Sequence, residues 1–304
     1  VREGQKFRLG ALSVESDVPE VDTAVFAEGI AVRSGATYAP TLVENTITRL
    51  ERLALREGLD FIRVTPRITR NDETQTLDVA FVLERGPRIF VERIDIEGNA
   101  TTLDRVIRRQ FVTVEGDPFN PREIRAAAER IRALGFFETA EVSTREGTSP
   151  EGVIVDVDVT EAPTGSLSFG LSYSAARGAG AAINYSERNF LGRGQLLSFA
   201  FDTGVDNSVS QVTFAEPAFL GRDVTLRFSA RYAQTDNEND EKFATDQISI
   251  TPSLEFPISE ASRLALRATL GRDELSSYQG SSAILQAEEA QGGLNRASLG
   301  YTIT

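Results

Sequence analysis

Long segments in the second half of the chain alternate apolar and polar residues with a period of two. Such alternation is typical of a β-strand with one apolar face. The clearest case, residues 165–174, places Leu167, Phe169, Leu171 and Tyr173 between Ser166, Ser168, Gly170 and Ser172. We predict seven more strands, at about 180–189, 195–203, 208–217, 223–234, 246–256, 263–272 and from 297 onward. Strands of about ten residues are long enough to cross a bilayer within a barrel.

The connections between these strands suggest an orientation. Those after the second, fourth and sixth strands are short, whereas residues 235–242 and 273–296 form long polar connections after the fifth and seventh strands. Outer-membrane barrels have short turns on the periplasmic side and long loops outside. A soluble β-sandwich or a lipocalin-like barrel would show the same alternation, because the pattern does not say whether lipid or a protein core covers the apolar face.

The first half of the chain contains two copies of one unit. Each copy has a strand, a short helix, a longer helix and two further strands, with the longer helices at about 41–56 and 122–134. Asn120 followed by Pro121 is a strong signal for a helix start, and Gly58 and Gly135 are typical helix ends. We predict β-α-α-β-β modules in which two helices cover one face of a three-stranded sheet.

Several short motifs occur at characteristic places in this arrangement. They are Ile94-Asp95-Ile96-Glu97-Gly98-Asn99, Glu115-Gly116-Asp117, Leu134-Gly135-Phe136-Phe137 and Asn189-Phe190-Leu191-Gly192-Arg193-Gly194. With these motifs the second copy resembles a POTRA domain. The whole chain resembles the last two POTRA domains and first barrel strands of the BamA-like outer-membrane barrel-assembly insertases.

This resemblance implies a fold class of α+β POTRA repeats followed by an antiparallel transmembrane β-barrel. About eight strands, the N-terminal half of the barrel, would be present. We expect domains at residues 1–85, 86–162 and 163–304. An open sheet edge in lipid leaves backbone groups unpaired, so we expect this chain to be part of a longer one. The family also implies a location in the bacterial outer membrane, with the POTRA domains in the periplasm.

The composition excludes several kinds of chemistry. The chain has no Cys, His, Met or Trp, which excludes disulfides, thiolate or histidine metal sites and Cys–His nucleophile pairs within it. A net charge of −13 disfavours a nucleic-acid partner. We therefore expect no enzyme activity, no cofactor, no metal and no nucleic acid.

The resemblance implies that the protein folds and inserts outer-membrane β-barrel proteins by pairing a client strand with a lateral gate. A TamA-like assembly factor and a two-partner secretion transporter remain alternatives, and a passive porin-type channel is a more remote one. We assign the gate to the first strand, because small residues weaken strand packing. The assigned residues are Gly165, Ser166, Leu167, Ser168, Phe169, Gly170, Leu171, Ser172 and Tyr173. Alternatively, the small side chains simply fill the barrel lumen.

The POTRA domains provide two further candidate surfaces. Their edge strands, marked by Phe61, Val64, Thr139 and Val142, would accept client strands by β-augmentation. The resemblance implies that the last POTRA binds a BamD-type accessory lipoprotein through its short helix, at Asp104, Arg105, Arg108, Arg109 and Gln110. Gln110 stands where relatives often carry Glu. Other expected partners are further lipoproteins of the assembly complex, nascent outer-membrane proteins, and outer-membrane lipid or lipopolysaccharide.

The sequence Phe-Leu-Gly-Arg occurs twice, at 190–193 and 219–222, each time at a predicted periplasmic turn. We interpret both copies as turn chemistry with an aromatic residue at the membrane interface.

Overall fold

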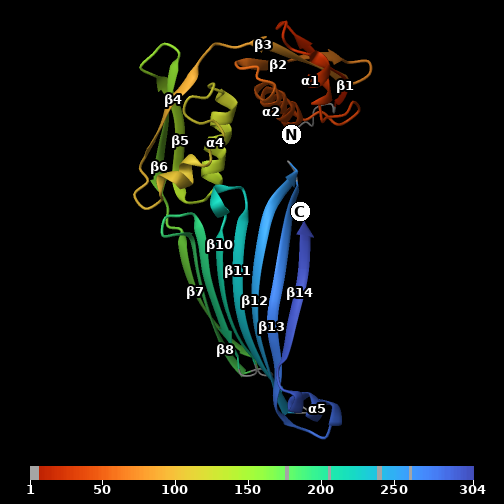
Figure 1. Cartoon of the computed structure of the whole chain (residues 1–304), viewed down its shortest axis with the longest axis vertical. Coiled ribbons are helices and arrows are strands. Elements are labelled where there is room, and N and C mark those ends of the chain that lie inside the picture. The colour runs from red at the N-terminus through yellow and green to blue at the C-terminus, as the bar shows by residue number, and fades with distance from the viewer. Residues whose placement is uncertain (1–6, 175–177, 205–206, 238–241, 260–261) are drawn as a thin grey trace. The chain divides into compact units, whose positions relative to one another are not determined.

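The computed structural model describes residues 7–174, 178–204, 207–237, 242–259 and 262–304 (Figure 1). The chain divides into two compact units. One consists of residues 1–97, 111–130 and 141–157, and the other of residues 98–110, 131–140 and 158–304. The first repeat therefore lies in one unit, the sheet of long strands lies in the other, and the second repeat contributes to both.

The first repeat contains β1 (Arg8–Ser16), α1 (Thr23–Glu28), α2 (Pro40–Arg56), β2 (Ile62–Asn71) and β3 (Thr76–Arg85). Its sheet has the order β1-β3-β2, with β1 parallel to β3. Apolar residues recur along α2 every three or four positions, which places them on one face of the helix. That face and alternate residues of β3 form the core of the repeat. The buried side chains from these elements are Val43, Ile47, Leu50, Ala54, Val79, Phe81 and Leu83.

The second repeat contains β4 (Phe90–Glu97), α3 (Asp104–Arg108), α4 (Pro121–Ala133), β5 (Phe137–Glu146) and β6 (Gly152–Glu161). Its sheet has the order β4-β6-β5. The element order repeats that of the first copy, and the predicted β-α-α-β-β organisation is confirmed. β3 ends at Arg85 and β6 at Glu161, and the domains expected at residues 1–85, 86–162 and 163–304 stay a prediction.

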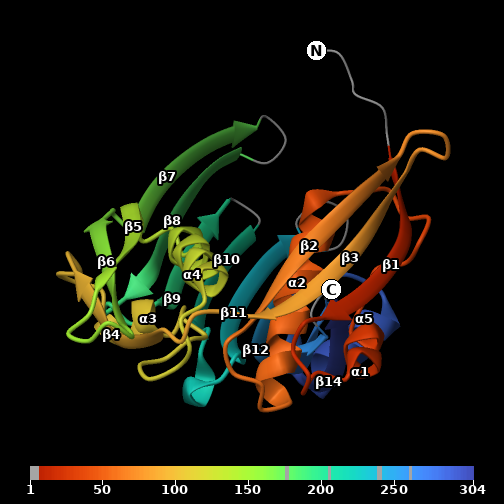
Figure 2. The same ribbon diagram turned by 90° about the horizontal axis from the view of Figure 1, so that it is seen from above.

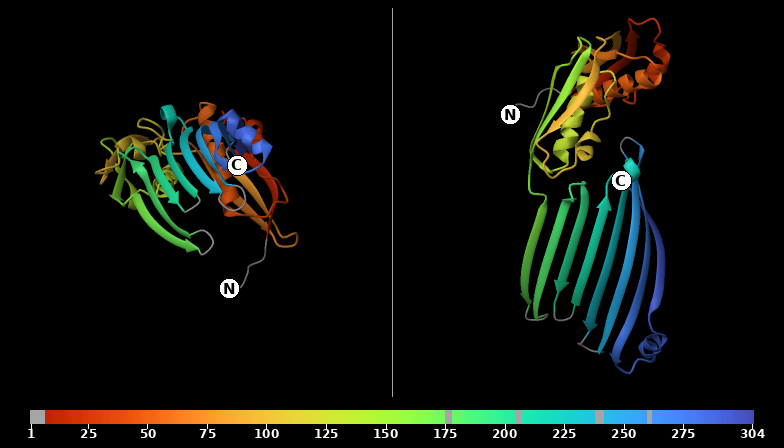
Figure 3. Two further views of the ribbon diagram at one scale, coloured as in Figure 1. Left: turned by 90° about the horizontal axis from the view of Figure 1, so that it is seen from below. Right: turned by 60° about the vertical axis from the view of Figure 1, so that its left-hand side comes forward.

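The second half of the chain forms one eight-stranded antiparallel sheet in which each strand pairs with its neighbours in sequence (Figure 3). Two short helices, η1 (Phe219–Gly221) and α5 (Ala283–Gln291), lie between strands. The strands are β7 (Gly165–Ser174), β8 (Gly178–Phe190), β9 (Gln195–Thr203), β10 (Asn207–Glu216), β11 (Thr225–Asn237), β12 (Lys242–Ser259), β13 (Ser262–Gln279) and β14 (Leu294–Ile303).

The two long polar connections are shorter than the sequence predicts. β12 and β13 each have 18 residues, and their pairing continues through Asp246↔Glu274 and Thr245↔Leu275. Residues 283–291 then form α5. The predicted strands end where the apolar alternation stops. The observed strands continue further because pairing depends on backbone hydrogen bonds, which polar residues form equally well.

The register gives the two faces of the sheet opposite character. Directly paired residues form a row of hydroxyl side chains across all eight strands: Ser166, Ser186, Ser198, Thr213, Ser229, Thr251, Thr269 and Ser298. The next row, on the opposite face, is apolar throughout: Leu167, Tyr185, Phe199, Val212, Ala230, Ile250, Leu270 and Ala297. Figure 2 views these strands from above. No helix among the described residues is long and apolar enough to span a membrane.

Candidate functional site

β7, the predicted gate strand, forms one edge of the eight-stranded sheet. Among the described residues it pairs only with β8. The Arg188 N–H donates to the Thr164 C=O at 3.3 Å. This hydrogen bond shows which residues of β7 direct their backbone N–H and C=O groups toward β8. Thr164 and every second residue after it direct their backbone groups toward β8, so those of Leu167, Phe169 and Leu171 face the open edge.

The outer half of β7 is weakly packed against β8. Gly170 pairs with Ala182, Leu171 with Ala181, and Ser172 with Gly180. Cross-strand side-chain contacts stabilise a sheet, and glycine and alanine offer few of them. Leu171 remains 90% exposed.

The opposite end of β7 is held by polar contacts. Glu187 accepts hydrogen bonds from the Thr164 hydroxyl, at 2.5 Å, and from the Asn189 N–H, at 2.8 Å. Glu161, at the end of β6, accepts from the backbone N–H groups of Thr101 and Thr102. Partial burial alone would raise the pKa of the Glu161 carboxyl, but these N–H donors and the hydroxyls of Thr102 and Thr101 together hold its pKa below the usual value. β7 is therefore fixed at the end nearest the second repeat and loose at the other.

The turn between β8 and β9 is docked on residues 101–109 of the second repeat. Asn189 is buried, donates to the Thr102 hydroxyl at 2.8 Å and accepts from the Gly194 N–H at 2.7 Å. The Leu103 N–H donates to the Gly192 C=O at 2.8 Å. Gly192 has a φ of +68°, and a Cβ atom there would lie 2.0 Å from the Thr101 carbonyl oxygen. Only glycine fits this contact.

The structure separates the five residues predicted to bind a partner. Asp104 and Arg105 are exposed, and Arg108 forms an ion pair with Asp104 at 2.8 Å. Gln110 donates to the Val106 C=O of its own segment. The Arg109 guanidinium instead approaches Gly194 in the β8–β9 turn.

Arg109 is exposed, but the surroundings of its guanidinium shift its pKa. Burial lowers its pKa, and the negative charge of Glu216 opposes that effect. The sequence pattern gave no sign that Arg109 is directed toward the sheet. Asp104, Arg105 and Arg109 are exposed, and Arg108 and Gln110 are half-buried, so the assignment of a partner surface to these five residues stays a prediction.

The edge of the first repeat, β2, is less open than the sequence predicts. The Val64 N–H points away from β3 and donates to Glu51 of α2 at 3.2 Å. Pro66, two residues further along the same edge, has no N–H to offer. These two positions cannot donate to an added strand. The outward donors that remain on this edge are those of Ile62, Ile68 and Arg70.

The edge of the second repeat, β5, carries the other two predicted residues, Thr139 and Val142. Here the Ala140 C=O accepts a hydrogen bond from the Arg132 guanidinium of α4 at 3.0 Å. Arg132 stands 11 positions after the proline that begins α4, and Glu51 stands 11 positions after the proline that begins α2. In each repeat, therefore, the side chain 11 positions after the first proline of the longer helix forms a hydrogen bond with a backbone group of a buried residue in the edge strand.

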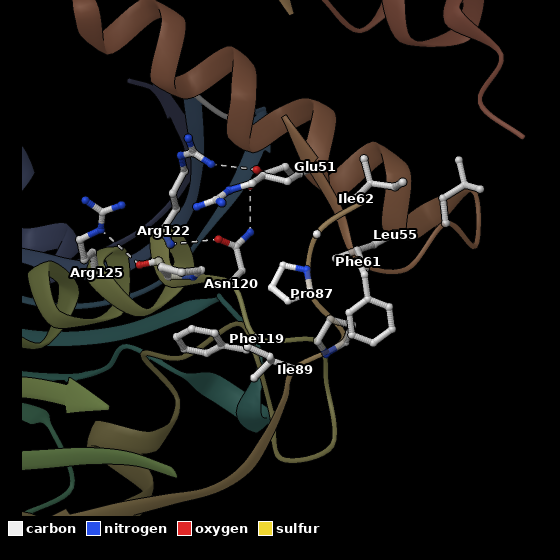
Figure 4. A pocket seen from close by; sticks show the side chains of 15 residues that line it. Glu51, Leu55, Phe61, Ile62, Pro87, Ile89, Phe119, Asn120, Arg122 and Arg125 are labelled. Atoms are coloured by element: carbon white, nitrogen blue, oxygen red, sulfur yellow. Dashed lines mark hydrogen bonds and ion pairs between the residues drawn. The ribbon is translucent and has the colours of Figure 1, made fainter. Parts of the chain in front are cut away.

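A cavity of about 200 Å³ lies beside this contact, where the first repeat meets the start of α4 (Figure 4). Its apolar wall includes Leu55, Phe61, Ile62, Pro87, Ile89 and Phe119. At its polar end Glu51 accepts hydrogen bonds from Asn120 and Arg122, each at 2.9 Å. Asn120 also caps α4 by accepting from the Arg122 N–H. Glu51 therefore joins the two repeats as well as closing the β2 edge.

Comparison with protein families gives two matches. A model described as the Omp85 superfamily domain matches residues 189–304. A POTRA model, described as a surface antigen variable number repeat, matches residues 89–162.

Curated relatives include the outer membrane protein assembly factor BamA of Neisseria meningitidis, 26% identical over 75% of this chain and 29% of that protein. BamA of Neorickettsia risticii is 25% identical over 92% of this chain and 38% of its own length. The chain thus spans well under half the length of these relatives.

Solved structures with a similar fold include BamA from Haemophilus ducreyi lacking POTRA domains 1–3, with a TM-score of 0.59 and 20% identity. That similarity covers 98% of this chain and 59% of that one. CdiB from Escherichia coli has a TM-score of 0.52 and 16% identity, over 99% of this chain and 56% of its own. Residues 89–162 thus match a POTRA domain and residues 189–304 the Omp85 superfamily domain, and together with the repeats and the sheet these matches support the assignment of this chain as a BamA-like member of the Omp85 superfamily.

Proposed function

We propose that this chain helps to fold β-barrel proteins and insert them into the outer membrane, with β7 as the template for a client strand. The observation that supports this most directly is the asymmetry of β7. Its end near Thr164 is held by Glu187, whereas its outer half is backed by glycine and alanine. The open edge presents the backbone groups of Leu167, Phe169 and Leu171, to which an extended segment can add by β-augmentation.

The relatives support this assignment. A BamA-like chain lies in the outer membrane with its POTRA domains in the periplasm, and curated relatives are named as outer membrane protein assembly factors. A TamA-like assembly factor or a two-partner secretion transporter would share the fold, and similarity to CdiB is compatible with either. A passive porin-type channel is the more remote alternative.

The POTRA domains would contribute binding surfaces. We assign accessory-lipoprotein binding of the BamD type to the exposed or half-exposed side chains of α3 and the two residues after it: Asp104, Arg105, Arg108, Arg109 and Gln110. Client segments would add to β5 and to the part of β2 beyond Pro66, since the buried part of the β2 edge is closed by Glu51.

A proline at the open edge of β7 tests the template directly. In the full-length protein, Leu171→Pro removes one outward N–H and leaves the β7–β8 hydrogen bonds in place, because Leu171 faces away from β8. Leu171→Ala also removes the leucine side chain but keeps the N–H. We expect the proline variant to lose client insertion into vesicles and the alanine variant to retain it.

Two outcomes would contradict the template. Equal client insertion by both variants would show that the edge donor is not used. Export of one secreted substrate with no insertion of barrel clients would favour the transporter instead. Heat-modifiable migration of each variant on a gel confirms that its own barrel has folded.

A further inference from the structure

The two Phe-Leu-Gly-Arg turns have the same backbone conformation. Leu191 and Leu220 have φ values of +55° and +56°, and the glycines that follow have φ values of +68° and +72°. In both turns the glycine N–H donates to the carbonyl three residues before it, and the arginine N–H does the same. The repeated sequence therefore specifies one turn structure twice, at the ends of β8 and β10.

Leucine is a poor choice for this backbone. A positive φ brings the side chain close to the main chain and costs about 1–2 kcal/mol for residues other than glycine, with asparagine among the better tolerated. Packing within the protein does not offset this cost, because Leu191 is 66% exposed and Leu220 is 80% exposed. A strained apolar residue that is exposed at two equivalent turns indicates contact with something outside the chain.

The neighbouring residues indicate what that contact is. The strands that these two turns connect carry Phe199, Val212 and Phe228 on their apolar face, and these side chains are between 39% and 45% exposed. Two residues after each leucine come Arg193 and Arg222, both exposed. Neither guanidinium has a hydrogen bond or ion pair within the described part of the chain. An apolar side chain beside an unpaired cation matches the boundary between acyl chains and phosphate groups in a bilayer.

We propose that both turns anchor the sheet in the periplasmic leaflet of the outer membrane, with Leu191 and Leu220 among the acyl chains and Arg193 and Arg222 at lipid phosphates. The two turns differ in one respect. The first is also docked on the second repeat through Gly192, whereas a Cβ atom at Gly221 would have no neighbour within 4 Å. The second turn shows no such docking at its glycine, so its contact with lipid can be tested separately from the repeat.

Depth measurements test the anchor independently of client insertion. Full-length single-cysteine variants at 191 and 220 carry an environment-sensitive fluorophore in vesicles of phosphatidylethanolamine and phosphatidylglycerol with nitroxide-labelled lipids. Phe228→Cys on the apolar face is the lipid reference, and Glu57→Cys, exposed after α2, is the water reference. We expect shallow-lipid quenching at 191 and 220 close to that at 228. Quenching as weak as at 57 overturns the proposal, and so does quenching that appears only after an accessory protein is added.

A second variant distinguishes the contact of Leu220 with lipid from the stability of the turn backbone itself. Leu220→Asn suits the positive φ, so the turn itself should form at least as well. Loss of one leucine from lipid should lower the ratio of folded to unfolded protein in vesicles on the order of tenfold at the parent's unfolding midpoint. A Leu220→Asn variant that is as stable in vesicles as the parent would contradict the proposal.

Discussion

The side-chain amide of Asn189 donates a hydrogen bond to the Thr102 hydroxyl at 2.8 Å and joins the β8–β9 turn to the segment before α3. Asn189 is buried, and its carbonyl oxygen simultaneously accepts from the Gly194 N–H. One side chain thus closes its own turn and fixes that turn to the second repeat. Glu161, at the end of β6 and four residues before β7, is bonded to Thr101 of the same segment, so the connection into the gate strand and the turn share one support.

Removing the Asn189 side chain should loosen this support. Asn189→Ala leaves the buried Gly194 N–H without its acceptor and removes one hydrogen bond from the Thr102 hydroxyl, and an unsatisfied buried group costs about 1–3 kcal/mol. A double-mutant cycle with Thr102→Val measures the direct interaction, which we expect to be about 0.5–1.5 kcal/mol by thermal unfolding in detergent. Strictly additive effects of the two substitutions would show that the hydrogen bond contributes nothing.

The two glycines of the repeated turn form a matched pair. Gly192→Ala and Gly221→Ala impose the same strain from positive φ, about 1–2 kcal/mol. Only Gly192→Ala brings a Cβ atom within 2.0 Å of the Thr101 carbonyl. We expect Gly192→Ala to expose the connection around residues 162–164 to protease, whereas Gly221→Ala leaves it protected. Equal cleavage of both variants would contradict the docked arrangement.

The sequence predicts the bounds of the strands more closely than it predicts the contacts that the strands and turns make. The bounds predicted for β7 and β9 are those observed, because each strand has an uninterrupted apolar alternation. The docked turn could not be separated from its copy by Phe-Leu-Gly-Arg alone. The difference lies just before it, where Asn189 precedes one copy and Ala218 the other.

The edge of β2 was also predictable in part. Pro66 within the strand is a sign of a blunted edge. The hydrogen bond from Val64 to Glu51 depends on how α2 packs across the sheet, and no local pattern reports that.

Acid should weaken the support of β7. The Glu161 pKa is lower in the folded protein than its ordinary value of 4.5. The carboxylate therefore contributes stability that is fully present above the ordinary pKa and is lost as the pH falls through the lower, folded-state pKa. We expect protease sensitivity at 162–164 to rise below about pH 4.5. Glu161→Gln should be more sensitive at neutral pH and should lose this part of the pH dependence, and an unchanged profile would assign the transition to another group.

Glu51 and Glu44 both contact Arg122 but differ in burial. Glu51 has 6% of its side chain exposed and Glu44 has 59%. Breaking a buried ion pair costs about 3–5 kcal/mol, whereas an exposed pair contributes about 0–1 kcal/mol. We expect Glu51→Ala to destabilise the repeats strongly and Glu44→Ala to have little effect.

Hydrogen exchange distinguishes this local role of Glu51 from a general loss of stability. The Val64 N–H is bonded to the Glu51 carboxylate and not to β3, so exchange in a peptide covering residues 62–70 should accelerate in Glu51→Ala. The same peptide should be unchanged in Glu44→Ala. Once Glu51 is removed, the Val64 donor becomes available at the β2 edge, and an added extended peptide should bind more tightly to this variant than to the parent. If exchange at 62–70 matched the parent in both variants, Glu51 would not close the edge.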